Sequence, residues 1–327
     1  MKAVVVEALG STEHMKCIDI PKPTISAKQV LIRVHTASVN FADIKSRYGK
    51  KGAAKLPFVP GLEASGIVEE VGADVTAFRK GDRVLAFPHN GSYAEYIAAD
   101  ELLTFAVPED IGLELAGACG IVSFLSCKLL TEVARMQPGE NIMVHAAAGG
   151  VGTTAIQIAK AMGAGLVIGT VGHENKIPAA QKAGADHVIS AEHQKIAEQV
   201  LDITGGRGVN IVLDSVGGEL TRESLNVLAM YGRLIIFGNS SGEYSQIGTG
   251  DLHASCRSVL GYSLGTTRKE RPESLRETAA TVFGLLESGK LNIHIGRTFP
   301  LHDAALAHDW VESRQSTGKV ILSVLTN

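Results

Sequence analysis

The first third of the chain alternates apolar and polar positions with the period of two that is typical of β-strands. Short runs of this kind before residue 115 include AVVVEA, QVLIRVHTASV, ASGIVEEVG and DRVLAF. Turn sequences such as Lys80-Gly81-Asp82 separate them. Several short strands that precede any long helix predict a small barrel or a curled sheet.

The pattern changes near Ile111, where LELAGACGIVSFLSCKLLTEVARM predicts one long apolar helix that ends before Pro138-Gly139. From Asn141 to Gly238, short apolar strands alternate with helices. Continuous apolar strands in this order predict a parallel sheet that is buried on both faces, as in a doubly wound α/β domain. The last part of the chain is expected to return to the first domain. The predicted division is therefore residues 1–118, 119–262 and 263–327, with the first and third parts forming one discontinuous domain.

Composition narrows the class of protein. The 327 residues include 31 Lys plus Arg and 34 Asp plus Glu, which gives a formal charge of −3, and 45% of the residues are hydrophobic. These values exclude a disordered protein, a collagen and a coiled coil. They predict no general attraction to nucleic acid or to anionic lipid. Without a secretory signal or a membrane span, the protein is expected to be soluble and cytoplasmic, and its four scattered cysteines are expected to be reduced.

A phosphate-binding turn is the most informative motif. In NIMVHAAAGGVGTTAIQIAKAMGA a predicted strand precedes the turn and a predicted helix follows it. Ala147, Gly149 and Gly152 occupy the three small-residue positions of the dinucleotide fingerprint. The helix N-terminus would bind the pyrophosphate through N–H groups and its positive dipole end.

The end of the next strand predicts which coenzyme is bound. NAD-binding domains of this kind place an acid there, whereas this strand ends in Gly169-Thr170-Val171-Gly172. Lys176 follows and could meet a 2′-phosphate, so NADPH is favoured over NADH. Glu174 is the counter-evidence, because its carboxylate could turn back to the ribose, although an acid in the first turn of a helix usually compensates the dipole.

Several motifs together indicate a family. They are VNFADIKSRYG at 39–49, VPGLEASGIVEEVG at 59–72, HAAAGGVG at 145–152, DSVGG at 214–218, FGNSSG at 237–242 and ESRQSTGKVIL at 312–322. With them the chain resembles the zinc-independent quinone oxidoreductases of the medium-chain dehydrogenase/reductase superfamily, a group that includes zeta-crystallin. The resemblance implies a GroES-like β-barrel catalytic domain, an inserted Rossmann domain and a cofactor held in the cleft between them.

The resemblance also implies that no zinc is bound. Zinc alcohol dehydrogenases of the superfamily carry a Cys after the second strand and a Gly-His-Glu motif, where this chain has Asn40 and Gly61-Leu62-Glu63. A tetrahedral zinc site needs thiolate or imidazole ligands that are missing at these positions. Without a metal to stabilise an alkoxide, an acceptor that is already electrophilic, such as a quinone, is favoured.

Site residues follow from the resemblance position by position. It implies that Gly149, Gly150, Val151 and Gly152 contact the pyrophosphate, that Lys176 and Arg314 face the 2′-phosphate, and that Phe237, Gly238 and Asn239 orient the nicotinamide. Lys319 is a further candidate for contact with the cofactor. Asn40, Asp43 and Tyr48 resemble the polar residues of the substrate side. Two departures from the family pattern are Ser190-Ala191, where a Tyr often flanks the adenosine phosphate, and Leu125-Ser126, where Thr-Ala is frequent.

Other interpretations of single residues remain open. Gly238-Asn239-Ser240-Ser241-Gly242, with Asp251 and His253 downstream, matches the G-x-S-x-G pattern of hydrolases, but no helix is predicted directly after the serine. Asp214 is expected to cap the turn that follows it, and His145 to be a hydrogen-bonded core residue. Tyr48, Arg314 and Lys319 could instead be ordinary structural or surface residues.

The resulting prediction is an NADPH-dependent, zinc-independent oxidoreductase that transfers hydride to a quinone and acts as a homodimer. A close alternative is an enone or alkenal double-bond reductase. A nucleotide-binding protein without turnover, like the relatives recruited as lens or RNA-binding proteins, is a second alternative. The acidic balance argues against RNA, so a small-molecule acceptor is the expected partner.

Overall fold

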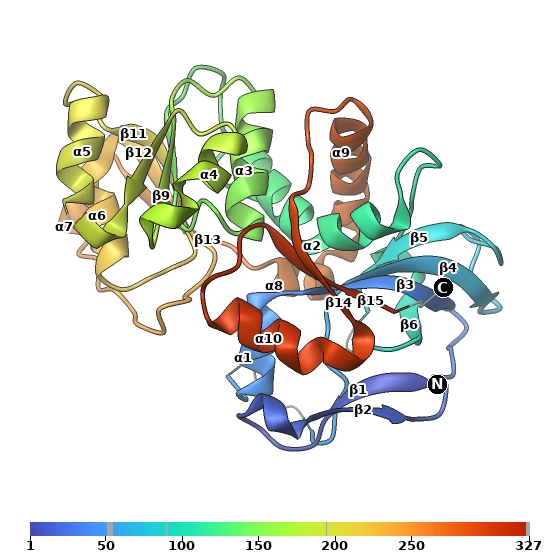
Figure 1. Cartoon of the computed structure of the whole chain (residues 1–327). Helices are drawn as coiled ribbons and strands as arrows, with labels where there is room; N and C mark the ends of the chain where they lie inside the picture. The colour runs from blue at the N-terminus through green and yellow to red at the C-terminus, as the bar shows by residue number, and fades with distance from the viewer. Residues whose placement is uncertain (51–54, 89–90, 194, 325–327) are drawn as a thin grey trace. The chain divides into compact units, whose positions relative to one another are not determined.

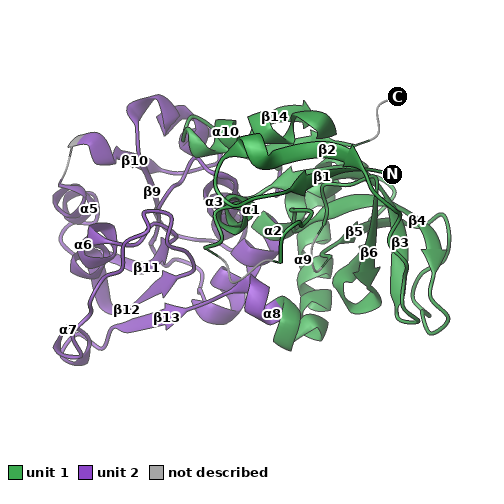
Figure 2. Cartoon of the chain, turned by 90° about the horizontal axis from the view of Figure 1, so that it is seen from below, with its two compact units in different colours: residues 1–122, 268–287, 293–327 green, residues 123–267, 288–292 purple. Residues whose placement is uncertain are grey.

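The chain forms two compact units. The structure is a computed structural model that describes residues 1–50, 55–88, 91–193 and 195–324 (Figure 1). Unit 1 contains residues 1–122, 268–287 and 293–327, and unit 2 contains residues 123–267 and 288–292 (Figure 2). The chain thus leaves unit 1 after Val122 and returns to it at Arg268. The division at 118/119 and 262/263 given by the sequence stays a prediction.

Unit 1 is built on a seven-stranded sheet in which strands from both ends of the chain pair. Its order is β14-β15-β3-β4-β5-β7, and β6 also pairs with β3. These strands are β3 (Gln29–Val39), β4 (Ala64–Val71), β5 (Arg83–Ala86), β6 (Tyr96–Asp100), β7 (Thr104–Ala106), β14 (Ile295–Pro300) and β15 (Lys319–Ser323). β1 (Lys2–Val6) and β2 (Met15–Asp19) form a separate antiparallel pair. β15 pairs antiparallel with β3, so the C-terminal segment completes the sheet that the N-terminal segment begins.

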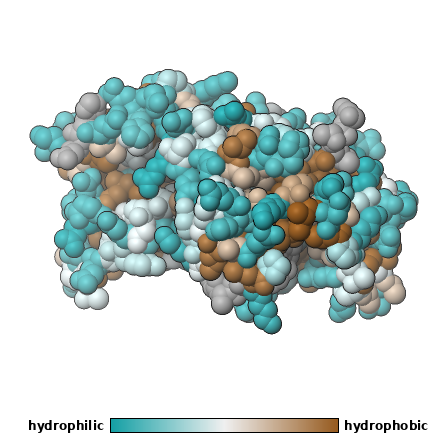
Figure 3. All heavy atoms as spheres, turned by 60° about the horizontal axis from the view of Figure 1, so that its bottom comes forward, coloured by the Kyte–Doolittle hydropathy of each residue, from teal (hydrophilic) through white to brown (hydrophobic). Residues whose placement is uncertain are grey.

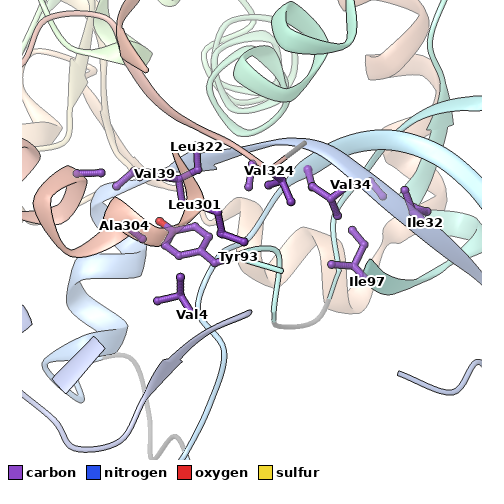
Figure 4. Packing of buried hydrophobic residues seen from close by; sticks show 14 of the residues in the cluster. Val4, Ile32, Val34, Val39, Tyr93, Ile97, Leu301, Ala304, Leu322 and Val324 are labelled. Atoms are coloured by element: carbon purple, nitrogen blue, oxygen red, sulfur yellow. The ribbon is translucent and has the colours of Figure 1, made fainter. Parts of the chain in front are cut away.

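The core of unit 1 explains why these strands alternate. Val34, Ile97 and Leu322 come from three strands and point into one cluster with Tyr93 and Leu301 (Figure 4). Two short helices and a longer one, α1 (Phe41–Arg47), α10 (Ala304–Glu312) and α9 (Leu275–Glu287), complete the unit. The predicted sheet of strands in the first part of the chain is therefore confirmed.

Unit 2 contains a six-stranded sheet with parallel neighbours throughout. The order is β10-β9-β8-β11-β12-β13. The strands are β8 (Ile142–Val144), β9 (Val167–Val171), β10 (His187–Ser190), β11 (Val209–Asp214), β12 (Leu228–Ile236) and β13 (Ser258–Gly261). The order reverses between β8 and β11, which is the switch point of a doubly wound fold. The predicted α/β class with a Rossmann domain is confirmed.

In unit 2, helices alternate with the strands along the chain. The helices are α3 (Gly150–Ala161), α4 (Ile177–Lys182), α5 (Ile196–Ile203), α6 (Glu219–Val227), α7 (Gly250–His253) and α8 (Leu264–Glu270), the last of which crosses into unit 1. Met143, Ile168 and Leu234 of three strands pack with Val200 of α5 and Leu225 of α6. This cluster explains why the strands read as continuous apolar runs.

The long helix α2 (Leu113–Lys128) contains the boundary between the units and continues in a π-helical turn at Leu129–Val133. By length and composition alone this 21-residue stretch could cross a membrane, since an 18-residue window of it has a mean hydropathy of 1.6. However, 72% of that window is buried inside the protein, as in a core helix. Elsewhere, the face in Figure 3 is mainly polar, with apolar atoms gathered in smaller patches.

Candidate active site

The glycine-rich turn lies between β8 and α3 and has the geometry of a dinucleotide-binding turn. Gly149 is the N-cap of α3, and Ala146, with φ 51°, reverses the chain so that its carbonyl accepts from Gly149 N–H at 2.9 Å. A Cβ on Gly152 would lie 2.4 Å from Ala146 O. Only glycine therefore lets α3 approach the strand end this closely.

Close packing against the neighbouring strand β9 explains why Ala147, the first small residue of the turn, is small. Ala147 is fully buried, and a Cβ on Gly169 of β9 would lie 2.7 Å from Ala147 Cβ. Gly149, Gly150 and Val151 remain partly exposed at the helix N-terminus. The first N–H groups of a helix have no acceptor within it, so this end can bind an anion such as a pyrophosphate. The turn fits the dinucleotide that its sequence predicts.

The loops after β11 and β12 are packed together at the same edge of the sheet. Phe237 N–H donates to Asp214 O at 2.9 Å, and Asn239 Oδ1 accepts from Gly242 N–H at 2.8 Å. A Cβ on Gly238 would lie 2.9 Å from Ser215 O. Phe237, Gly238 and Asn239 are thus held in a fixed loop at the carboxyl ends of the strands, where ligands of such sheets bind.

Two buried polar residues near this edge have structural roles, as the sequence predicted. Asp214 Oδ1 accepts from Val216 N–H at 2.7 Å and from Gly217 N–H at 3.1 Å, so this carboxylate caps the turn. The ring nitrogens of His145 lie 2.7 Å from Thr170 Oγ1 and from Ser224 Oγ. Burial lowers the pKa of His145 to about 4, against the opposing effect of Asp214. Neither residue has a free group for catalysis.

The hydrolase interpretation is excluded by the local backbone. Residues 240–242 form bends, and no helix begins before Gly250 in the described chain beyond Ser240. A nucleophile elbow needs a helix directly after the serine. Ser241 Oγ instead donates to Val216 O at 2.8 Å and holds the two loops together.

Charged residues follow the carboxyl end of β9, where the sequence predicts the adenosine ribose. Lys176 closes a 3-10 turn (Glu174–Lys176) and is partly exposed. Glu192, which follows β10, accepts from His173 Nδ1 at 2.9 Å and from Glu174 N–H at 3.0 Å. The hydrogen bond with His173 is the largest cause of the lowered pKa of Glu192. Sequence reasoning looked for an acid only at the end of β9 and so missed Glu192.

In unit 1, Asn40 is part of a buried network that includes a charge pair. Asn40 Nδ2 donates to Glu63 Oε1 at 2.9 Å, and Lys319 Nζ donates to Asn40 Oδ1 at 2.8 Å and to Glu63 Oε1 at 3.0 Å. Ile121 N–H donates to Glu63 Oε2 at 2.6 Å. The side chains of Glu63 and Lys319 are 0% and 2% exposed. Lys319 is therefore not a surface charge, and the network joins β3, β4, β15 and α2.

Asp43 belongs to a second buried network. Its Oδ2 accepts from Asn40 N–H at 2.8 Å and from the Tyr93 hydroxyl at 3.3 Å. The Tyr93 hydroxyl also lies 3.1 Å from His308 Nε2. Burial, followed by the charge of Asp43, raises the pKa of Tyr93 well above its usual value. The Asp43 side chain is 1% exposed, so it positions the start of α1 and Tyr93.

Tyr48 and Arg314 lie at the surface of unit 1. The Tyr48 hydroxyl, on a side chain that is 40% exposed, donates to Glu312 Oε1 at 2.5 Å. This hydrogen bond is the largest cause of the raised pKa of Tyr48. The guanidinium of Arg47 binds the other oxygen of Glu312 at 2.5 Å. Arg314 is exposed and adopts a left-handed conformation with φ 59°.

Some buried polar residues of unit 1 are candidates that sequence reasoning missed. Glu63 was considered only as part of a motif without zinc ligands, and Tyr93 and His308 were not considered. Glu63 is the single charge between Pro60 and the apolar strand that begins at Ala64, and a charge in such a place needs a buried partner. Among the described residues, no group of three or more His, Cys, Asp or Glu side chains could hold a metal ion.

Comparison with known proteins finds related families for both parts of the chain. Residues 26–109 match the family model described as alcohol dehydrogenase GroES-like domain, and residues 150–280 match the model described as zinc-binding dehydrogenase. A quinone oxidoreductase of Pseudomonas aeruginosa is 35% identical over 98% of this chain and 99% of its own. The quinone oxidoreductase of Sus scrofa is 36% identical over 98% of this chain and 97% of its own.

Solved structures are also similar to this chain along nearly its whole length. The Escherichia coli quinone oxidoreductase complexed with NADPH is similar with a TM-score of 0.93 at 32% identity, covering 99% of this chain and all of that one. A mycobacterial protein complexed with NADPH gives a TM-score of 0.92 at 33% identity, covering 99% of this chain and 100% of that one.

Proposed function

Because the chain belongs to the quinone oxidoreductase family of the medium-chain dehydrogenase/reductase superfamily, we propose that this oxidoreductase uses NADPH to reduce a quinone without a catalytic metal. The observation that carries the proposal is the glycine turn before α3, in a chain similar along nearly its whole length to quinone oxidoreductases. Two of the similar structures contain NADPH.

The coenzyme would be held in unit 2 by the main chain. When bound, NADPH supplies the hydride. The N-terminus of α3, at Gly150, Val151 and Gly152, would bind the pyrophosphate, and Lys176 would face the 2′-phosphate. The fixed loop Phe237–Asn239 would orient the nicotinamide. Arg314 of unit 1 stays a candidate for coenzyme contact on the family resemblance, whereas the ammonium of Lys319 is buried against Glu63 and Asn40 and is assigned a structural role.

The residues found where related enzymes carry zinc ligands support metal-free chemistry. Asn40 and Glu63 occupy this region, and Lys319 contacts both of them. The Lys319 ammonium lies 3.0 Å from the Glu63 carboxylate, and Glu63 also accepts from Asn40 and from Ile121 N–H. A fixed buried cation beside this carboxylate opposes the binding of a divalent ion through electrostatic repulsion. The amide of Asn40 is also a poor ligand for zinc compared with a thiolate.

The acceptor side is proposed to involve Asn40 and Tyr48, with Asp43 as a positioning residue. All three lie on or next to α1. Tyr48 is exposed, and its phenol is protonated at neutral pH, with a pKa that the hydrogen bond to Glu312 raises further. It would donate to an acceptor oxygen by exchanging Glu312 for the acceptor as its hydrogen-bond partner. Asp43 is buried and bound to Asn40 N–H, so it acts through the position of Asn40. A quinone is electrophilic enough to need orientation more than acid catalysis.

The test is turnover with matched acceptors. Purified protein is mixed with NADPH and either a small quinone or an enone of similar size, and the loss of reduced nicotinamide is followed by absorbance. We expect faster turnover of the quinone, unchanged after dialysis against a chelator. Faster reduction of the enone would make the protein an alkene reductase, and loss of activity on chelation would refute the metal-free chemistry.

We also propose that the protein is a homodimer formed through β13. This strand is the last of the unit 2 sheet, pairs with β12 on one side only within the described chain, and is partly exposed. Met230 and Tyr231 of β12 are exposed apolar residues, and Tyr231 N–H donates to the carbonyl of Ser255, shortly before β13, at 3.1 Å. An open edge beside exposed apolar side chains favours pairing with a second copy. Sedimentation at micromolar concentration should give twice 34.4 kDa, and a 34.4 kDa particle would refute it.

A further inference from the structure

The carboxylate of Glu192 lies at the end of β9, although Glu192 follows β10. The register explains how it gets there, because Ser190, the last residue of β10, pairs with Val171, the last residue of β9. Two residues further along each segment, His173 Nδ1 lies 2.9 Å from Glu192 Oε1. Glu192 Oε2 accepts from Glu174 N–H at 3.0 Å.

This strand end is the place at which a doubly wound domain distinguishes its coenzymes. The glycine turn follows β8, and β9 is the neighbour of β8 in the parallel sheet. In such domains the adenosine ribose lies at the carboxyl end of this second strand, where an acid accepts from the 2′-hydroxyl of NAD. β9 itself ends in Val171-Gly172 and supplies no acid. Glu192 supplies one from the next strand.

We propose that Glu192 is the residue that senses the 2′-position of the coenzyme ribose, and that its carboxylate limits the preference for NADPH over NADH. The inference rests on the proposed function and names a specificity determinant of the same coenzyme site. Glu192 is 44% exposed on its side chain, so a ligand can reach it, while the bonds from His173 and Glu174 hold it at the end of β9.

The charges explain the direction of the effect. A carboxylate accepts a hydrogen bond from the 2′-hydroxyl of NADH but repels the 2′-phosphate of NADPH. Lys176, which closes the turn that begins at Glu174, attracts the same phosphate. Opposite charges from two segments therefore act on one ligand group. The protein should bind both coenzymes, with a smaller preference for NADPH than Lys176 alone would give.

The experiment measures binding without any acceptor, so it is independent of quinone turnover. Calorimetry compares 2′,5′-ADP with 5′-AMP, which differ only in the 2′-phosphate. Glu192→Gln keeps an oxygen acceptor and removes the charge. We expect Glu192→Gln to bind 2′,5′-ADP about tenfold more tightly, as the loss of one nearby charge predicts, and 5′-AMP within about twofold of the wild type.

The matched control is Asp202→Asn. It removes one exposed carboxylate at the far end of α5, the helix that follows β10, and so changes net charge equally. Unchanged affinity of Glu192→Gln for 2′,5′-ADP, or an equal gain in Asp202→Asn, would overturn the inference. Wild-type protein that binds neither nucleotide would overturn the coenzyme proposal itself, whereas nucleotide binding without quinone turnover would refute only the acceptor.

Discussion

Lys319 at the start of β15 places its ammonium 3.0 Å from the carboxylate of Glu63, just before β4, with both side chains almost fully buried. The two residues are 256 positions apart in the chain. The pair therefore connects the C-terminal strand to a strand of the N-terminal part. Asn40 and Ile121 N–H provide further hydrogen bonds to Glu63, so the buried charges are paired and solvated by the protein itself.

Removal of the ammonium should destabilise the fold strongly. Lys319→Met leaves the Glu63 carboxylate buried without its countercharge, which typically costs about 3–5 kcal/mol. Urea denaturation followed by circular dichroism measures the free energy of unfolding. The double variant Glu63→Gln/Lys319→Met, which buries no net charge, should recover a large part of the loss. A double variant as unstable as the single one would show that packing, not charge, is responsible.

The fold could be predicted from the sequence because its signals are local. The period of two up to residue 115 and the alternation of strands and helices after Asn141 each follow from burial of one or both faces of a sheet. Asp214 and His145 were also interpreted correctly, since a polar residue at the end of an apolar strand must find nearby hydrogen bonds.

Two contacts could not be predicted from local patterns. They are the buried pair of Lys319 with Glu63 and the position of Glu192 at the end of β9. Lys319 and Glu63 meet only because β15 and β4 both pair with β3, and sequence distance gives no sign of this contact. Glu192 reaches the end of β9 through strand register, whereas the usual rule looks for an acid on β9 itself. Long-range pairing decides both cases, and a single sequence does not encode it in any local pattern.

Gly152→Ala should weaken coenzyme binding sharply. The added Cβ would lie 2.4 Å from Ala146 O and 2.6 Å from Ala147 Cα, so the turn or the start of α3 must move. We expect at least about tenfold weaker binding of NADPH in a fluorescence titration, since a shift there misplaces the N–H groups for the pyrophosphate. Gly250→Ala, where the new Cβ meets no atom within 4 Å, is the control and should bind normally.

Tyr48→Phe tests the acceptor side. The variant loses the hydroxyl that donates to Glu312 on an exposed side chain, so the free energy of unfolding should change little. If the phenol donates to the acceptor oxygen, kcat/KM for the quinone should fall about tenfold while the KM for NADPH stays constant. Thr281→Val, which removes an exposed helix hydroxyl on α9, is the control. An unchanged kcat/KM in Tyr48→Phe would limit Tyr48 to a structural role.

The buried side chain of His308 should make the free energy of unfolding depend on pH. His308 on α10 is fully buried, its Nε2 lies 3.1 Å from the Tyr93 hydroxyl, and its Nδ1 has no hydrogen-bond partner among the described residues. Burial, with a smaller effect of the Arg47 guanidinium, lowers the pKa of His308 from 6.5 to about 3. The folded protein therefore keeps this ring neutral at a pH at which the unfolded chain protonates it.

The free energy of unfolding should accordingly fall as the pH is lowered below 6.5, because the unfolded state binds the extra proton, and the loss should continue towards pH 3. One such histidine contributes a slope of up to about 1.4 kcal/mol per pH unit. Urea denaturation between pH 7 and pH 5 measures the slope in the wild type and in His308→Gln, which has no titrating group at this site. The slope should be smaller in His308→Gln, while His187→Gln, at an exposed histidine of β10, should retain the wild-type slope. Equal slopes in the wild type and in His308→Gln would mean that the ring is protonated, or reached by water, in the folded protein.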